Sequence, residues 1–211
     1  MTKEGLSNII IHKVNDTRYL SEINPNYGVE FDVRSNNGDL VLSHDPVGAN
    51  DELNFLDDFI KLCEGRLLIA NIKEAGIEER VINLLQSYSE KFFLLDCEMP
   101  FLIKNQKKFG KYLSIRYSKL ESIETVKNFS QYVKWVWIDT YENLDLSKIK
   151  NYMLDDLNTV LVSPERWDIN SDLNIFIKKL QNEKIKLDYV MTDPENSSIW
   201  EANSSIFSYK I

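Results

Sequence analysis

The stretch VEFDVRSNNGDLVLSHD, residues 29–45, decides the fold that we expect of this chain. Its first part, Val29–Arg34, alternates so that Glu30 and Asp32 lie on one face of a strand and the apolar residues on the other. The chain then returns through a hairpin-like strand, Val41–Asp45, that ends in Ser43-His44-Asp45. We count these two strands as one β unit.

Similar short apolar runs recur along the chain and alternate with amphipathic stretches of helical period. The other predicted strands are Asn8–Lys13, Arg66–Lys73, Lys91–Asp96, Tyr112–Ser118, Val133–Thr140, Thr159–Glu165 and Asp188–Asp193. The predicted helices are Glu52–Glu64, Glu78–Ser89, Pro100–Phe109, Leu120–Phe129, Leu146–Leu157 and Leu173–Lys184.

Eight β units alternating with helices predict a mixed α/β fold with a parallel sheet. In a chain of 211 residues this count favours a small (β/α)8 TIM barrel without a large insertion domain. We expect one domain over residues 1–211. An open doubly wound sheet is the alternative, but the sequence lacks the glycine-rich phosphate turn of that fold.

The composition argues against some classes of binding partner. Asp and Glu number 33 against 25 Lys and Arg, so the formal net charge is −8 and a nucleic-acid partner is not expected. Cys63 and Cys97 form no C-x-x-C pair, which predicts buried thiols in a reducing compartment. The first residues lack the long apolar run of a signal peptide or membrane span. We therefore expect a cytoplasmic protein with no stable membrane association, and the oligomeric state stays open.

The predicted strand ends carry the polar residues, and chemistry in a (β/α)8 barrel lies at that face. Both histidines of the chain, His12 and His44, fall there and are candidates for an acid and a base. Glu30 and Asp32, about 6–7 Å apart along one strand face, could share a hard divalent cation. The other interpretation is a solvated outer strand face with Arg34 as the partner of the carboxylates.

The order of these residues resembles that of glycerophosphodiester phosphodiesterases, within the superfamily of phosphatidylinositol-specific phospholipase C barrels. The matching residues are His12-Lys13, Asn15-Asp16-Thr17, Glu30-x-Asp32-Val33, Asn37-Gly38-Asp39-Leu40-Val41, His44-Asp45, Asn71-x-Lys73 and Thr192-Asp193-Pro194. The resemblance implies a (β/α)8 barrel and a metal-assisted hydrolase that cleaves a glycerophosphodiester to glycerol phosphate and an alcohol, with a place in lipid metabolism.

The same resemblance implies a role for each matching residue. His12 and His44 correspond to the catalytic pair, and Glu30 and Asp32 to ligands of Mg²⁺ or Ca²⁺, while Lys73 corresponds to a lysine that faces the phosphate. Asn71 stands where the family has an anionic ligand, and a neutral amide oxygen weakens such a site.

Two other departures concern Lys13 and the loop after His44. Lys13 replaces the arginine that the family places after its first histidine, so it brings charge to a phosphate oxygen without a bidentate fork. The segment from His44 to Arg66 is too short for the family's usual insertion, which predicts an open cleft.

Further pocket residues follow from their positions at strand ends. A third oxygen for the cation could come from Asp96, Glu98, Asp139 or Glu165. Trp137 and Trp167 are candidates for the pocket wall, with core packing as the alternative.

Two rival functions remain open. One is a catalytically degenerate barrel that binds a phosphorylated metabolite or sugar without turnover, because Asn71 replaces a charged ligand. The other is a phospholipase-type enzyme acting on a membrane lipid, against which the acidic charge and the lack of a basic amphipathic helix count.

Overall fold

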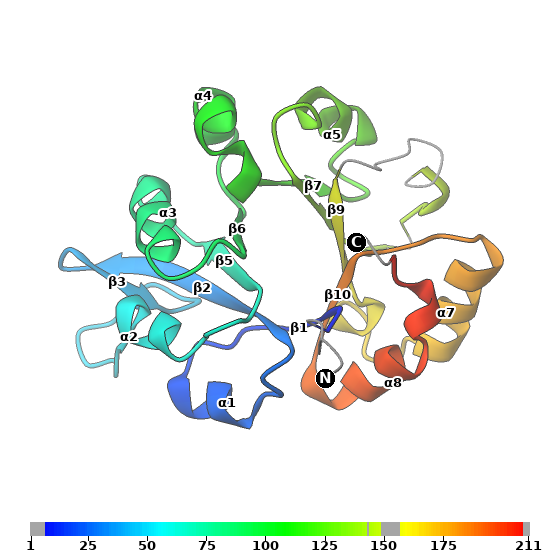
Figure 1. Ribbon diagram of the computed structural model, residues 1–211, viewed down its shortest axis with the longest axis horizontal. Coiled ribbons are helices and arrows are strands. Elements are labelled where there is room, and N and C mark those ends of the chain that lie inside the picture. The colour runs from blue at the N-terminus through cyan, green and yellow to red at the C-terminus, as the bar shows by residue number, and fades with distance from the viewer. Residues whose placement is uncertain (1–6, 143, 149–156, 209–211) are drawn as a thin grey trace, which may run out of the picture.

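The computed structural model describes residues 7–142, 144–148 and 157–208 (Figure 1). It has a mixed α/β fold, which confirms the predicted fold class, and it is built on a ten-stranded sheet. The strands are β1 (Ile9–Ile11), β2 (Gly28–Asn36), β3 (Asp39–Leu42), β4 (Asn54–Phe55), β5 (Leu68–Ile72), β6 (Phe92–Leu95), β7 (Ser114–Tyr117), β8 (Trp135–Ile138), β9 (Asn158–Val162) and β10 (Tyr189–Thr192).

The helices lie around the outside of the strands (Figure 1). They are α1 (Thr17–Glu22), α2 (Leu56–Lys61), α3 (Glu78–Gln86), α4 (Met99–Phe109), α5 (Ile123–Phe129), α7 (Leu173–Asn182) and α8 (Ser197–Ala202). Five of the predicted helices are therefore present. The sixth, Leu146–Leu157, falls mostly on residues 149–156, outside the described residues.

Parallel pairing connects most of the sheet. The ladders run β7-β8-β9-β10-β1-β2-β5-β6, each pair parallel, while β3 and β4 add on antiparallel beside β2. Between β6 and β7 the pairing is reduced to one parallel bridge, Leu94 with Leu113. The Ser114 hydroxyl reinforces it by donating to the Leu94 carbonyl at 2.8 Å.

Apolar residues cover both faces of the parallel strands. On β6, Phe92 and Leu94 belong to a large core cluster shared with the helices, whereas Phe93 and Leu95 belong to a second, smaller cluster. Adjacent residues divide in this way because side chains alternate along a strand. Burial on both faces is why these strands are continuous apolar runs in the sequence.

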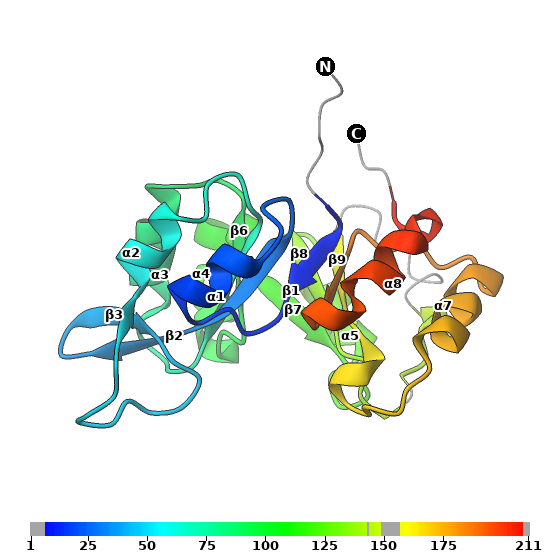
Figure 2. The ribbon, with the colours of Figure 1, turned by 90° about the horizontal axis from the view of Figure 1, so that it is seen from below.

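The β2–β3 hairpin sets the position of the second histidine. It turns at Asn37 and Gly38, whose φ angles of 51° and 96° lie in the left-handed region that a tight hairpin turn requires. The hairpin extends outward on the side of α2 (Figure 2). Its return strand brings Ser43 back to β2, where the Ser43 N–H donates to the Asp32 carbonyl at 3.1 Å. His44 therefore follows at the end of the sheet where Asp32 lies.

Sequence patterning missed the shortest elements. Helix α1 has six residues and buries only Leu20, so it has no detectable period; its start is fixed by Asp16, whose side chain accepts from the N–H groups of Arg18 and Tyr19. Helix α8 and the two-residue strand β4 were also missed, because they too are short. Within the described part of the chain, no helix is long and apolar enough to cross a membrane.

Truncating the smaller cluster tests the importance of this packing. Phe93 is 0% exposed and its ring is stacked on Trp135 at a centroid distance of 4.4 Å. We expect Phe93→Ala to lower the free energy of unfolding by about 3–5 kcal/mol, because it leaves a cavity between rigid strands. Phe55→Ala, at a side chain that is 41% exposed, is the matched control and should cost far less. Denaturant unfolding of both variants measures this, and equal losses would contradict the packing described.

Candidate active site

A cavity of about 200 Å³ lies at the carboxyl ends of the parallel strands. Six of the residues predicted for the site line it: His12, Glu30, Asn71, Trp137, Asp139 and Trp167. Arg116 and Arg166 complete its polar wall, and Leu95, Val162 and Met191 form its apolar floor. The structure thus brings together residues from distant parts of the sequence.

Glu30 is the most deeply buried charged group of this cavity. It is 1% exposed, and its two carboxylate oxygens accept from the Lys13 backbone N–H at 2.8 Å and from the Asn71 amide at 2.9 Å. Lys13 has a φ of 54°, and its backbone N–H rather than its exposed side chain reaches Glu30. Burial and the neighbouring Asp32 carboxylate raise the pKa of Glu30, against the opposing influence of His12.

Asp32 lies beside Glu30 on β2 and is 2% exposed. Asn15 forms two hydrogen bonds with Asp32. The Asn15 amide donates to Asp32 Oδ2 at 2.7 Å, and the Asp32 backbone N–H donates to Asn15 Oδ1 at 2.8 Å. Lys73 Nζ lies 3.0 Å from the other carboxylate oxygen. The interpretation of this strand face as a solvated outer surface is wrong, because the alternation directs both carboxylates inward.

His12 connects the carboxylates to the last strand. Its Nε2 lies 4.0 Å from Glu30 Oε2, and its Nδ1 lies 3.7 Å from Asp193 Oδ1. Arg166 donates to the other Asp193 oxygen at 2.6 Å, and its second nitrogen lies 3.5 Å from His12 Nε2. The proximity of His12 and the hydrogen bond from Arg166 lower the pKa of Asp193.

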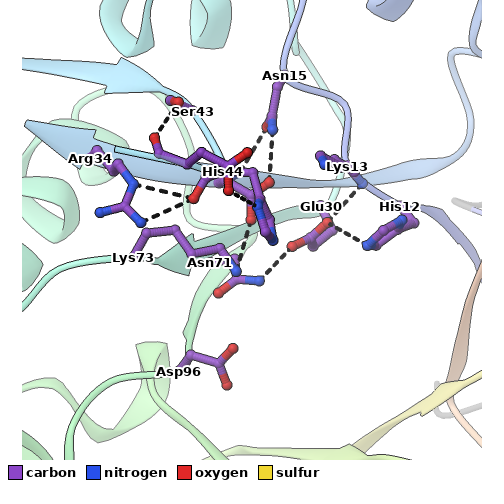
Figure 3. Close-up of polar contacts among 12 residues, drawn as sticks. His12, Lys13, Asn15, Glu30, Arg34, Ser43, His44, Asn71, Lys73 and Asp96 are labelled. Atoms are coloured by element: carbon purple, nitrogen blue, oxygen red, sulfur yellow. Dashed lines mark hydrogen bonds and ion pairs between the residues drawn. The ribbon is translucent and has the colours of Figure 1, made fainter. Parts of the chain in front are cut away.

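His44 lies in the loop after β3 and is not among the residues that line the cavity. Its side chain is 49% exposed, and its Nδ1 is 2.9 Å from Asp45 Oδ1. Arg34 fixes the loop by donating from Nε and a terminal nitrogen to the His44 carbonyl, at 3.2 and 3.0 Å. The hydrogen bond from His44 lowers the pKa of Asp45, and the charges of Lys13 and Arg34 add to this. His44 is drawn with the other site residues in Figure 3.

Arg116 organises the opposite side of the cavity. Its guanidinium forms ion pairs with Asp139 and Asp96, which follow the neighbouring strands, and its Nε is 3.7 Å from Glu121. Burial opposes the guanidinium charge, but Asp96 and the other carboxylates outweigh it and raise the pKa of Arg116. Burial raises the pKa of Asp139, against the opposing influence of Arg116.

Of the remaining predicted site residues, some line the cavity and others lie outside it. Asp96 does not line the cavity and stands apart from Asn71 (Figure 3). Glu165 is also outside the lining; it accepts from the hydroxyls of Ser163 and Thr192 and joins two strand ends. Trp137 is 3% exposed, whereas Trp167 is 52% exposed and packs edge-on against Tyr141, so Trp167 forms the outer wall.

Sequence reasoning assigned no role to Arg116, Arg166 or Asp193. Arg116 lies near the end of β7, and Arg166 and Asp193 follow β9 and β10, so a position at a strand end was the available signal. What the sequence could not reveal is that each arginine is paired across strands, because such pairs depend on strand order.

The residues on β2 and β5 suit a hard divalent cation, because they provide two anionic ligands. No group of three or more His, Cys, Asp or Glu residues that could hold a metal occurs within residues 7–142, 144–148 and 157–208. Glu30 and Asp32 nevertheless supply two buried carboxylates, and Asn71 Oδ1 is a buried oxygen without a hydrogen-bond partner. Oxygen donors of this kind suit Mg²⁺ or Ca²⁺.

Comparison with solved structures identifies the fold. No protein-family model matches the sequence, and no curated protein matches it either. Among solved structures, a glycerophosphodiester phosphodiesterase from Agrobacterium tumefaciens superposes with a TM-score of 0.65 at 13% identity, covering 89% of this chain and 97% of its own. The chain shares the fold of this enzyme. An Oleispira antarctica phosphodiesterase, solved with its product sn-glycerol-3-phosphate, superposes with a TM-score of 0.64 at 16% identity and covers 95% of this chain and 97% of its own.

The contacts of Asp193 predict a pH-dependent contribution to stability. A carboxyl whose pKa is lowered by folding stabilises the protein above its unfolded pKa, and this stabilisation is lost as the pH falls through the folded pKa. Asp193→Asn should therefore lower the free energy of unfolding by about 1–2 kcal/mol at pH 7, with the difference from wild type shrinking below pH 4.

Denaturant unfolding at several pH values measures this effect. The exposed Asp39 is the matched control, and Asp39→Asn should show little change at any pH. A loss for Asp193→Asn that stayed constant down to acid pH would show that the charge of Asp193 is not what stabilises the fold.

Proposed function

We propose that this chain is a phosphoric diester hydrolase of the glycerophosphodiester phosphodiesterase family, cleaving a glycerophosphodiester to glycerol phosphate and an alcohol. The observation that carries the proposal is the buried pair Glu30 and Asp32, with His12 and Lys73 in contact with it at the carboxyl ends of the strands. The similarity in fold to phosphodiesterases, one of them bound to sn-glycerol-3-phosphate, supports the same activity.

The proposal includes a closed (β/α)8 barrel. Seven parallel ladders connect eight strands in series, and the bridge from Leu94 to Leu113 would close the ring between β6 and β7. The two core clusters also support it, one on the helix side of the strands and the other on the opposite side. A cavity at the carboxyl ends of the strands is where barrel enzymes carry their chemistry.

His12 is suited to act as the base. Asp193 at Nδ1 favours a proton on that nitrogen, so Nε2 is the nitrogen that would accept the proton of the attacking water or substrate hydroxyl. Arg166 near Nε2 helps to hold the ring, since it is itself fixed by Asp193. His44, on the exposed rim, would then protonate the leaving alkoxide, with Asp45 orienting its ring.

The phosphate needs positive charge, and the chain supplies it from more than one side. Lys73 is held by Asp32, and Lys13 follows His12 in the sequence. Arg166 and Arg116 line the cavity itself. Preorganised cations of this kind stabilise the charge that develops on phosphate oxygens in the transition state.

Glu30, Asp32 and Asn71 would hold a divalent cation, Mg²⁺ or Ca²⁺. When bound, such an ion supplies Lewis-acid stabilisation of the phosphoryl oxygens. Its positive charge would also offset the repulsion between the two carboxylates, which the protein alone compensates with Lys73 and donors from Asn15, Asn71 and Lys13.

A second candidate function is binding of a phosphorylated metabolite without turnover. The observation that favours it concerns Asn71. Its amide nitrogen donates a hydrogen bond to Glu30, and its side chain brings no negative charge to the cation site. Measurable product formation distinguishes the enzyme from the binding protein.

Replacing each histidine tests the catalytic assignment. We expect His12→Ala and His44→Ala each to lower kcat for glycerophosphodiesters about 10²–10⁴-fold, the usual contribution of a general acid or base. Product release from a panel of glycerophosphodiesters, assayed with Mg²⁺, Ca²⁺ or chelator, measures this. Lys91→Ala, at an exposed position before β6, is the control. Full activity of either histidine variant would remove that histidine from the mechanism.

Restoring a charged ligand tests the cation site. Asn71→Glu should raise the affinity for Mg²⁺ or Ca²⁺ on the order of tenfold or more, because ligand charge tunes divalent-ion affinity. Calorimetric titration with the metal alone measures this without any assay of activity. Asn83→Glu, exposed on α3, adds the same charge elsewhere and should leave the affinity unchanged. Equal affinities for wild type and Asn71→Glu would mean that Asn71 is not a ligand position.

A further inference from the structure

A second cavity, of about 370 Å³, lies between β6 and β7 and the helices α4 and α5 that flank them in Figure 1. We call it the seam pocket. Its lining includes Leu95, Leu102, Ile115, Arg116, Leu120 and Thr125.

The seam pocket exists because two strands separate. β6 and β7 share only the bridge from Leu94 to Leu113, whereas the neighbouring strands share full ladders. Leu95 belongs to the smaller core cluster and Ile115 to the larger one, yet both line the same pocket. The pocket is therefore in contact with both core clusters.

The seam pocket adjoins the candidate active site. Leu95 and Arg116 line both cavities. Arg116 stands between them, held by Asp139 on one side and Asp96 on the other. A ligand bound at His12 and Glu30 could extend past Arg116 into the seam pocket.

One part of the seam pocket lining suits an apolar group. Leu95, Leu102 and Ile115 are buried in it, and Met99 and Leu120 are 44% and 82% exposed at its edge. Its polar residues already have partners: the Ser114 hydroxyl donates to Leu94, the Ser122 hydroxyl accepts from the Thr125 N–H, and Glu121 accepts from Ser118. Arg116 is shared among Asp96, Glu121 and Asp139. The charged groups of the pocket are thus gathered at Arg116, on the side of the active site.

We propose that the seam pocket binds an unbranched alkyl or acyl chain carried by one of the two alcohols of the phosphodiester substrate. This inference rests on the proposed function and adds the substrate class. The active-site cavity, at about 200 Å³, is smaller than the roughly 300–1,000 Å³ of ordinary ligand pockets. It accommodates the phosphate and a small alcohol, and the adjoining pocket supplies the apolar volume for the rest of the substrate.

A series of alkyl 4-nitrophenyl phosphates tests the proposal, with methyl, butyl and octyl chains kept below the concentration at which micelles form. Each methylene buried in the seam pocket should raise kcat/KM about fourfold until the pocket is full. Equal kcat/KM for the methyl and octyl esters would overturn the proposal.

Two substitutions in the lining test whether the preference for the octyl ester arises in the seam pocket. Leu120→Asp at the edge and Thr125→Trp within the pocket should abolish the preference for octyl and leave the methyl ester unchanged. Ile175→Asp is the matched control, at a side chain that is 68% exposed on α7, and should keep the preference. A preference that survives in both lining variants would place the chain elsewhere.

Failure of the proposed function gives a different result. If wild type hydrolyses none of the three esters, the hydrolase is contradicted, and the seam pocket is then tested by equilibrium dialysis with methyl and octyl phosphate. Octyl phosphate that binds at least tenfold more tightly in wild type, but not in Thr125→Trp, would still support the pocket. Equal binding of the two phosphates would overturn it.

Discussion

Two carboxylates that repel each other are buried side by side on β2, and the rest of the site is arranged around the cost of keeping them there. Glu30 and Asp32 are almost fully buried, so each must be compensated by hydrogen-bond donors or by positive charge. Donors from Asn15, Lys13 and Asn71 and the ammonium of Lys73 provide this. Even so, the pKa of Glu30 stays raised, so the compensation within the chain is incomplete. This incomplete compensation is the reason for proposing that the face binds a cation and a phosphate.

The same constraint explains how charges are distributed around the cavity. Each arginine is paired with carboxylates from other strand ends: Arg166 with Asp193, and Arg116 with Asp96 and Asp139. These pairs connect the ends of neighbouring strands and hold the cavity walls in place. Arg116 has a further consequence, because it spans the place where the sheet is least complete. The weak pairing of β6 with β7 opens the seam pocket, and the ion pairs of Arg116 tie together the strand ends beside it.

The sequence alone predicted the strands well and the site in part. Alternation along Val29–Arg34 predicted that Glu30 and Asp32 share a face, and long apolar runs marked the buried parallel strands. The sequence could not show whether that face is buried, since the interior and the surface of a sheet give the same alternation. It also could not pair Arg116 with Asp139 or Arg166 with Asp193, because such contacts depend on strand order. Short elements such as α1 and β4 were missed because they contain too few residues to show a period.

The central claim is that this buried acidic face, with its histidines, cleaves a phosphodiester at phosphorus. Phosphorus NMR of the wild-type protein with a glycerophosphodiester, Mg²⁺ or Ca²⁺, and oxygen-18-enriched water tests it directly. The account predicts that the diester resonance is replaced by that of a phosphate monoester carrying the isotope shift of one heavy oxygen. A diester resonance that persists unchanged with either metal, or a monoester without the isotope shift, would contradict it.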